Sequence, residues 1–204
     1  GSEMCIRDSS KCWAQRNVDH PDAIKAMKKE WDRLRERTVW NEELVEEWES
    51  VKKRFGTSPV HVGDILETCT QKCDELPDTP ENKDLKKFKG RVCYGGHRVK
   101  DQTGHAAMFQ EYHSCPAGIT SSRACDFYGM LPGNVLQQSD ADMAYCQTTF
   151  RGTPTYVRIP KHRWPDSWHG KYWDPVCPLE KALYGHPESG YYWDCLLYTS
   201  DAAD

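Results

Sequence analysis

Two aspartates in the stretch QQSDADMAYCQ, residues 137–147, are the residues whose type and spacing most directly suggest chemistry. The stretch alternates like a strand, and a carboxylate in an apolar strand is costly to desolvate unless it is paired, hydrogen-bonded or bound to a cation. One interpretation is that Asp140 caps a helix beginning at ADMAY, with Asp142 in its first turn. The other is a Mg²⁺ site, because Mg²⁺ binds through one or two carboxylates plus substrate phosphates.

Basic side chains concentrate between residues 83 and 100, around a strand-like stretch that contains Lys89 and Arg91. The net charge of -4 and a pI near 6.1 give the chain no general basic character, so any nucleic-acid contact must come from a local patch. The basic stretch is either a solvated strand and loop or a patch that contacts phosphate. Its members are Lys83, Lys86, Lys87, Lys89, Arg91, Arg98 and Lys100.

Cysteine and histidine provide a third possible chemistry. Cys69 and Cys73 are four residues apart, and His61, His97 and His113 could complete a zinc site. The spacing differs from that of common zinc ribbons and fingers, and no second close cysteine pair follows. The 10 cysteines are scattered singly among apolar or aromatic neighbours, which is typical of free thiols in a reducing compartment.

The composition predicts part of a larger globular protein. The chain has 204 residues, a hydrophobic fraction of 38% and a mean hydropathy of -0.82, which predicts a modest core. No long apolar run is present in the sequence, so we expect no membrane partner and a soluble, intracellular protein. Residues 1–10 and 195–204 resemble translated library-adaptor sequence, which leaves residues 11–194 as the expected domain, with the native part ending near Asp194.

Hydrophobic periodicity predicts the elements that must position these residues. Apolar residues spaced by three and four predict one helix opening at Pro21 and a second, within residues 41–55, ending at Gly56. Residues 58–73 suggest short extended pieces, because Pro and Gly interrupt the pattern. Residues 88–94 predict a strand that a hairpin turn at Gly95-Gly96 connects to a return strand. A further helix is expected within residues 121–133 and a strand within residues 153–160.

Several of these stretches resemble, in order, the reverse transcriptase of copia-type retrotransposons. Asp140 is followed by Ala144 and Tyr145 at the family's spacing from its metal-binding Asp to its aromatic residue. The segment LEKALYGHPESGYYW resembles another family motif, and TYVRIP resembles the strand that precedes it. Upstream, AMKKEWDRLRERTVW and KGRVCYGG resemble the leading helix and the lysine-x-arginine strand. The resemblance extends from Pro21 to Trp193.

This resemblance implies an α+β chain that forms the fingers and partial palm of a right-hand polymerase, with an antiparallel sheet backed by helices. The intact parent would be an RNA-directed DNA polymerase that holds two Mg²⁺ ions roughly 3.5–4 Å apart for nucleotidyl transfer. By resemblance, Asp140 is a catalytic metal ligand, Tyr145 lies beneath the sugar of the incoming nucleotide, and Lys89 and Arg91 contact triphosphate or template. The implied partners are a primer–template of RNA or DNA, deoxynucleoside triphosphates and the remainder of a Pol polyprotein. The implied location is cytoplasmic, in a virus-like particle, or nuclear.

The sequence departs from the family pattern at three places. One is Tyr94-Gly95-Gly96-His97, where another basic residue is usual. Glu188 stands where the family has a Gln that touches the nucleotide. No Asp-Asp dipeptide occurs in the sequence, so the hairpin that supplies the other metal carboxylates is not included, and we expect the chain to be an inactive fragment. The alternatives are a catalytically dead nucleic-acid-binding remnant and an interaction module stabilised by a Cys/His metal site.

Overall fold

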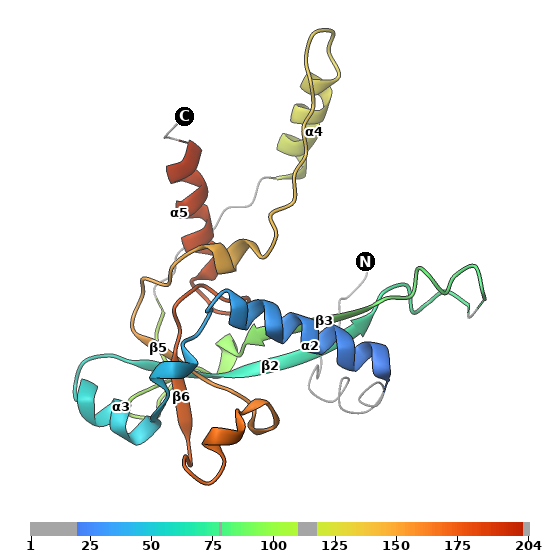
Figure 1. Ribbon diagram of the computed structural model, residues 1–204. Helices are drawn as coiled ribbons and strands as arrows, with labels where there is room; N and C mark the ends of the chain where they lie inside the picture. The colour runs from blue at the N-terminus through green and yellow to red at the C-terminus, as the bar shows by residue number, and fades with distance from the viewer. Residues whose placement is uncertain (1–19, 78, 110–117, 202–204) are drawn as a thin grey trace.

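The computed structural model describes residues 20–77, 79–109 and 118–201 and contains a mixed α+β arrangement built on one sheet (Figure 1). The sheet has six strands, with the order β1-β6-β5-β2-β3, and β4 pairs separately with β2. One long helix, α2, lies across β2 and β3, and a shorter helix, α3, packs near the other end of the sheet. The α+β class and the sheet backed by helices are therefore confirmed.

Helix α2, Pro21–Glu36, forms where the periodicity predicts it. Pro21 occupies the first turn, where a missing N–H costs nothing, and His20 Nδ1 accepts a hydrogen bond from the Asp22 backbone N–H. One face is buried against the sheet. That face consists of Ala23, Met27, Trp31 and Leu34, whereas Ile24 is exposed. The helix thereby covers the main core, which also contains Val92, Tyr94 and Leu183.

Strand β2, His61–Gln71, is a single strand of 11 residues rather than the short extended pieces that the sequence suggests. It is continuous because it has partners on both edges: β3, Phe88–Tyr94, pairs with its second half and β5, Thr155–Arg158, with its first. Gly63 interrupts the apolar pattern but does not break the strand. The ring of Tyr94 lies where a Cβ at position 63 would be, so the glycine permits close packing.

The sequence predicts an antiparallel sheet, but the observed sheet contains one parallel pair of strands. Strand β5 pairs with β2 in parallel, while β6, Pro175–Pro178, pairs with β5 in the antiparallel sense. Strand β1, Glu46–Glu47, completes that edge beside β6. A parallel neighbour requires a long connection between the strands, here the whole segment between β2 and β5, and local sequence patterns carry no information about it.

The prediction of a hairpin turn at Gly95-Gly96 is also wrong. A short 3-10 turn, Gly96–Arg98, follows β3, and the next strand, β4, Lys100–Asp101, pairs with β2 instead of β3. Because β4 and β5 both pair with His61 and Val62, they lie on opposite edges of β2. The chain therefore continues along the same edge of β2 from β3 into β4.

The predicted second helix is shorter than its charged segment. A 3-10 turn, Glu42–Leu44, and strand β1 precede α3, Trp48–Phe55. Gly56 ends the helix with a positive φ, as expected. Trp48 and Val51 pack with Tyr156 and Val176 in a second, smaller core cluster. Leu44 lies in the 3-10 turn before the helix and is exposed.

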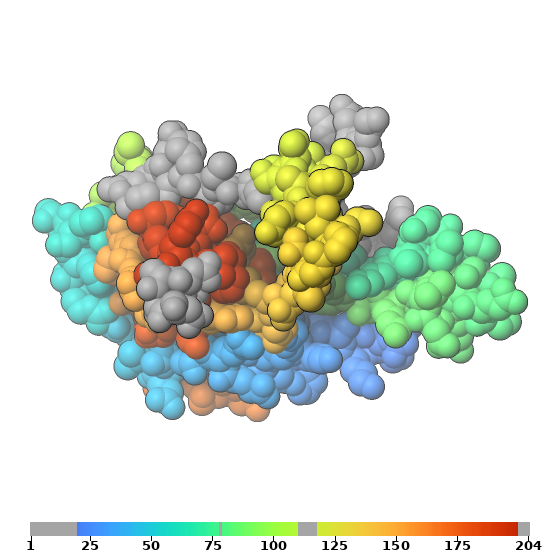
Figure 2. Space-filling view, turned by 90° about the horizontal axis from the view of Figure 1, so that it is seen from above, coloured from blue at the N-terminus to red at the C-terminus, as the bar shows by residue number. Residues whose placement is uncertain are grey.

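Two helices, α4 (Ile119–Gly129) and α5 (Ser189–Asp201), do not cover the sheet. Helix α4 has no buried residue, and it stands apart from the body in Figure 1. In the view from above, its yellow atoms are separated from the red atoms of α5 (Figure 2). Helix α5 continues through part of the adaptor-like segment. Three 3-10 turns, Ala144–Gln147, Lys161–Arg163 and Asp166–Trp168, lie in the connections. In the described parts of the chain, no helix combines the length and apolar character needed to cross a membrane.

Candidate functional site

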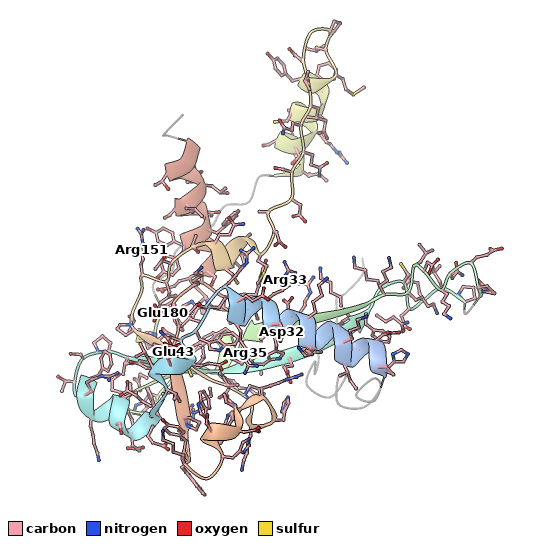
Figure 3. The ribbon with its side chains drawn as sticks, in the orientation of Figure 1. Asp32, Arg33, Arg35, Glu43, Arg151 and Glu180 are labelled. Carbon is pink, nitrogen blue, oxygen red and sulfur yellow. The ribbon has the colours of Figure 1, made fainter. Side chains whose placement is uncertain are left out.

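A cleft of about 360 Å³ lies between α2, β3 and residues 140–143. Lys89, Arg91 and Asp140 all line it, so the structure brings together three of the residues that the sequence singles out. Figure 3 places a fourth lining residue, Arg33, near the end of α2, below the segment that descends from α4. The volume lies within the range of small-molecule sites.

Strand periodicity explains the basic wall of the cleft. Successive strand residues point to opposite faces, and Gly90 and Val92 face α2. Lys89 and Arg91 alternate with these buried positions along β3, and both are exposed and line the cleft. Neither has an ion-pair partner among the described residues, so both cationic groups are available to an anionic ligand.

Helix α2 supplies an acidic and a basic residue to the cleft. The Glu30 carboxylate lies 4.0 Å from the Arg33 guanidinium, one turn away along the same face. Burial raises the pKa of Glu30, and the positive charges of Arg33, Lys89 and Arg91 act against that rise. The cations of β3 are therefore close enough to influence a carboxylate on α2.

The loop wall contains both aspartates, and it is neither a strand nor a helix cap. Asp140 is exposed in a segment without regular structure. The following 3-10 turn begins at Ala144, and its capping position is Met143, which makes no side-chain capping bond. The strand suggested by the alternation of residues 137–147 does not form, because residues 134–141 have no strand partner within the described chain. The prediction that Asp140 caps a helix is also wrong, because the helical turn begins later than expected.

Asp142 holds this loop against α2. Arg33 Nη2 donates to one of its carboxylate oxygens, and Arg37 Nη2 lies 3.2 Å from the other. The hydrogen bond from Arg33 lowers the pKa of Asp142, and the positive charges of both arginines add to that effect. Gln147 Nε2 also donates to the Asp142 carbonyl oxygen at 2.9 Å. Asp142 is thus occupied by internal contacts, whereas Asp140 has no hydrogen-bond or ion-pair partner among the described residues.

The donor set fits only part of a magnesium site. Asp140 offers one free, exposed carboxylate, which is compatible with Mg²⁺ that takes its other ligands from phosphates and water. In residues 20–77, 79–109 and 118–201, no three His, Cys, Asp or Glu side chains gather as metal ligands. The described residues could therefore contribute a single ligand to a metal that is carried by a nucleotide.

Tyr145 lies behind the cleft rather than in its wall. It is half-buried in the 3-10 turn after Met143, and its ring centroid is 4.8 Å from that of Tyr184. Tyr184 is the aromatic residue that lines the cleft. The contribution of Tyr184 could have been found in the sequence only through its place in the KALYG segment.

Glu188 lies away from these residues. It is buried immediately before α5, and Tyr192 Oη donates a hydrogen bond to its Oε2 at 2.8 Å. It does not line the cleft, so the structure does not bring the last of the predicted nucleotide-binding residues to the others. Its assignment stays a prediction that rests on the family resemblance.

The residues considered for zinc are also dispersed. His61 and Cys69 lie eight positions apart on one extended strand, which separates them by roughly 26 Å. His97 is exposed in the turn after β3, and His113 lies outside the described residues. The described geometry gives no support to a Cys/His metal site.

One buried polar cluster has no counterpart in the sequence patterns. His61 Nδ1, Tyr94 Oη and His186 Nε2 are buried without a hydrogen-bond partner in the part of the chain that the structure describes. Aromatic rings surround the two histidines: Phe109 contacts both, and Phe150 contacts His186. The members come from segments more than 30 positions apart, so only the fold brings them together.

No protein-family model, curated protein or solved structure matches the chain.

Proposed function

We propose that the cleft binds the triphosphate of a deoxynucleotide, and that the chain is the nucleotide-binding portion of an RNA-directed DNA polymerase from a retrotransposon polyprotein. The observation that carries the proposal is that Lys89, Arg91 and Asp140 line one cleft, and none of the three has an ion-pair partner within the described part of the chain. The sequence separates these residues by about 50 positions.

The distribution of charge favours a metal–phosphate ligand over a simple anion. Lys89 and Arg91 enter the cleft from β3, and Asp140 enters it from the loop of residues 140–143. A bare phosphate would be attracted by one wall and repelled by the other. A triphosphate with its divalent cation presents negative charge to the first wall and positive charge to the second, so both walls interact favourably with it.

The resemblance to copia-type reverse transcriptases supports the same assignment from independent information. It places a metal carboxylate at Asp140 and phosphate or template contacts at Lys89 and Arg91, and these positions line the cleft. Fingers and partial palm of a polymerase remain the proposed fold identity of the α+β chain. Bound Mg²⁺ would neutralise developing phosphate charge, and the chain's own side chains would hold and orient the nucleotide.

Equilibrium binding of dTTP in the presence of Mg²⁺ tests the proposal. Replacing Lys89 or Arg91 with Gln removes one charge-assisted hydrogen bond and should weaken binding by about tenfold each. Lys53→Gln is the matched control, because Lys53 is an exposed lysine on α3, outside the cleft. Asp140→Asn should weaken binding in Mg²⁺ but strengthen binding measured in EDTA, because without the metal the Asp140 carboxylate repels the triphosphate.

Two results would contradict the proposal. The first is a wild-type chain that does not bind dTTP at millimolar concentration. The second is binding that the Lys53→Gln control weakens as much as the cleft variants do. A chain that binds RNA or DNA but not dTTP would favour the catalytically dead nucleic-acid-binding remnant.

A further inference from the structure

Tyr184 is the aromatic side chain of the cleft, although the family spacing directs attention to Tyr145. Tyr184 lines the cleft together with Lys89, Arg91 and Asp140. Tyr145 is not a lining residue, and its ring packs against that of Tyr184 with the two planes at 53°. A ligand in the cleft therefore meets Tyr184, with Tyr145 as its support.

The backbone of Tyr184 is fixed to the end of β3. Its carbonyl oxygen accepts a hydrogen bond from the Tyr94 N–H at 2.7 Å. The next residue, Gly185, has a φ of +90°, and a Cβ there would overlap the carbonyl oxygen of Tyr94. Two backbone segments thus approach each other closely, in a way that only glycine allows. A ring on so constrained a segment loses little conformational freedom when a ligand packs against it.

The chemistry around Tyr184 suits a ligand with an aromatic end and an anionic end. The side chain is half-buried, and burial raises the pKa of its hydroxyl, which therefore stays protonated at neutral pH. Glu30 and Arg91 are near enough to influence that pKa, so the ring adjoins the charged part of the cleft. A nucleobase stacks readily on a tyrosine ring, and this interaction tolerates all four bases.

We propose that Tyr184 packs against the nucleoside of a nucleotide whose phosphates lie at Lys89 and Arg91, and that Tyr145 is a positioning residue that acts through Tyr184. This inference rests on the proposed function and adds to it the residue that distinguishes a nucleotide from an inorganic polyphosphate. It also moves direct contact with the ligand from Tyr145 to Tyr184.

Comparison of two probes, dTTP and inorganic tripolyphosphate, both with Mg²⁺, tests the inference. The wild-type chain should bind dTTP more tightly than tripolyphosphate, because only dTTP offers a nucleoside. Tyr184→Ala should weaken dTTP binding by roughly tenfold and leave tripolyphosphate binding unchanged. Tyr184→Phe should retain most of the dTTP affinity, whereas Tyr184→Leu, which keeps apolar bulk without the ring, should not. Tyr128→Ala is the control, since Tyr128 is an exposed tyrosine on α4.

The role of Tyr145 is measured with a double-mutant cycle. Tyr145→Ala alone should weaken dTTP binding by a smaller factor than Tyr184→Ala does, and Tyr145→Phe should behave as wild type. In the Tyr184→Ala background, Tyr145→Ala should have no further effect, because its target ring is gone. Additive effects of the two substitutions would overturn the positioning role.

The outcomes separate this inference from the proposed function. A wild-type chain that binds neither probe overturns both. A chain that binds dTTP through Lys89 and Arg91 but is unaffected by Tyr184→Ala overturns only the role of Tyr184. Equal weakening of dTTP and tripolyphosphate by Tyr184→Ala also overturns it, because the ring would then act on the fold or on the phosphate contacts. Unchanged tripolyphosphate binding shows that the variant is folded.

Discussion

Acidification from pH 7 to pH 5 should destabilise the protein through His186. This histidine is 4% exposed, and the rings of Tyr94, Phe109 and Phe150 lie within 5.3 Å of its own, centroid to centroid. Its Nδ1 accepts a hydrogen bond from the Glu188 N–H, so the neutral ring carries its proton on Nε2, which has no hydrogen-bond partner among the described residues. Burial, with a smaller contribution from the charge of His61, lowers the pKa of His186 to about 3.

The magnitude follows from the difference in proton binding between the two states. The unfolded chain takes up a proton at His186 near pH 6.5, whereas the folded chain does not until about pH 3. Stability is therefore constant above about pH 6.5 and falls with decreasing pH by about 1.4 kcal/mol per unit until pH 3. At pH 5 the loss from His186 is about 2 kcal/mol, a substantial part of the 5–15 kcal/mol typical of a domain.

Neighbouring groups define the useful pH window. Burial also lowers the pKa of His61, which adds to the loss, although Glu188 and Asp101 oppose that shift. The pKa values of Asp101 and Asp142 are lowered in the folded state. Any stability that these aspartates contribute is present above pH 4 and is lost only as the pH falls further. The raised pKa of Glu30 acts in the opposite direction, because the folded chain takes up that proton before the unfolded chain does as the pH falls. The interval from pH 7 to pH 5 therefore reports on the buried histidines together with Glu30, and comparison with a His186 variant isolates the contribution of His186.

Urea unfolding at pH 7, 6 and 5, followed by tryptophan fluorescence, measures the effect. The free energy of unfolding of the wild type should fall across this range with an unchanged m-value. His186→Phe removes the titrating group while preserving aromatic packing. The number of protons taken up on unfolding, which sets the slope of the unfolding free energy against pH, should therefore fall by about one. His169→Gln, at an exposed position, should leave it unchanged. Equal wild-type stability at pH 7 and pH 5, or an undiminished slope in His186→Phe, would refute the reasoning.

Three further predictions concern the loop, a glycine and catalysis. Asp142→Asn should accelerate hydrogen exchange in residues 140–147, because it weakens two arginine contacts, and should leave the amides of β2 unchanged. Gly185→Ala should cost about 1–3 kcal/mol more than Gly133→Ala in urea unfolding, since both glycines have a positive φ but only Gly185 faces a backbone oxygen. With primer, template, nucleotides and Mg²⁺, the 204-residue chain should show no extension above background, because Asp140 lacks the partner carboxylates that two-metal transfer requires. Unchanged exchange, equal costs for the two glycines, or reproducible extension would contradict these predictions in turn.

Local sequence patterns predicted the elements whose form depends on near neighbours. Helix α2 was predictable because the spacing of Met27, Trp31 and Leu34 is a property of one turn and the next. The exposure of Lys89 and Arg91 on one face of β3 likewise follows from the alternation of a strand.

The remaining features depend on contacts between distant parts of the chain. The continuity of β2 requires β3 on one edge and β5 on the other, so the sequence around Gly63 could not reveal it. The alternation around Asp140 did not produce a strand, because backbone groups form a strand only when another strand pairs with them. Arg33 and Tyr184 join the cleft from positions about 150 residues apart, so their association required the structure.

The location of a bound nucleotide is the most direct test of the central claim. Mn²⁺ can replace Mg²⁺ at oxygen ligands, and its unpaired electrons broaden the NMR signals of nearby nuclei. Titration of the ¹⁵N-labelled chain with dTTP and substoichiometric Mn²⁺ should broaden the amide signals of residues 89–93 and 140–143 before those of α3. Asp140→Asn should reduce this broadening. A well-dispersed spectrum in which the cleft signals stay sharp, or in which broadening appears first at another surface, would contradict the assignment of the cleft as a nucleotide site.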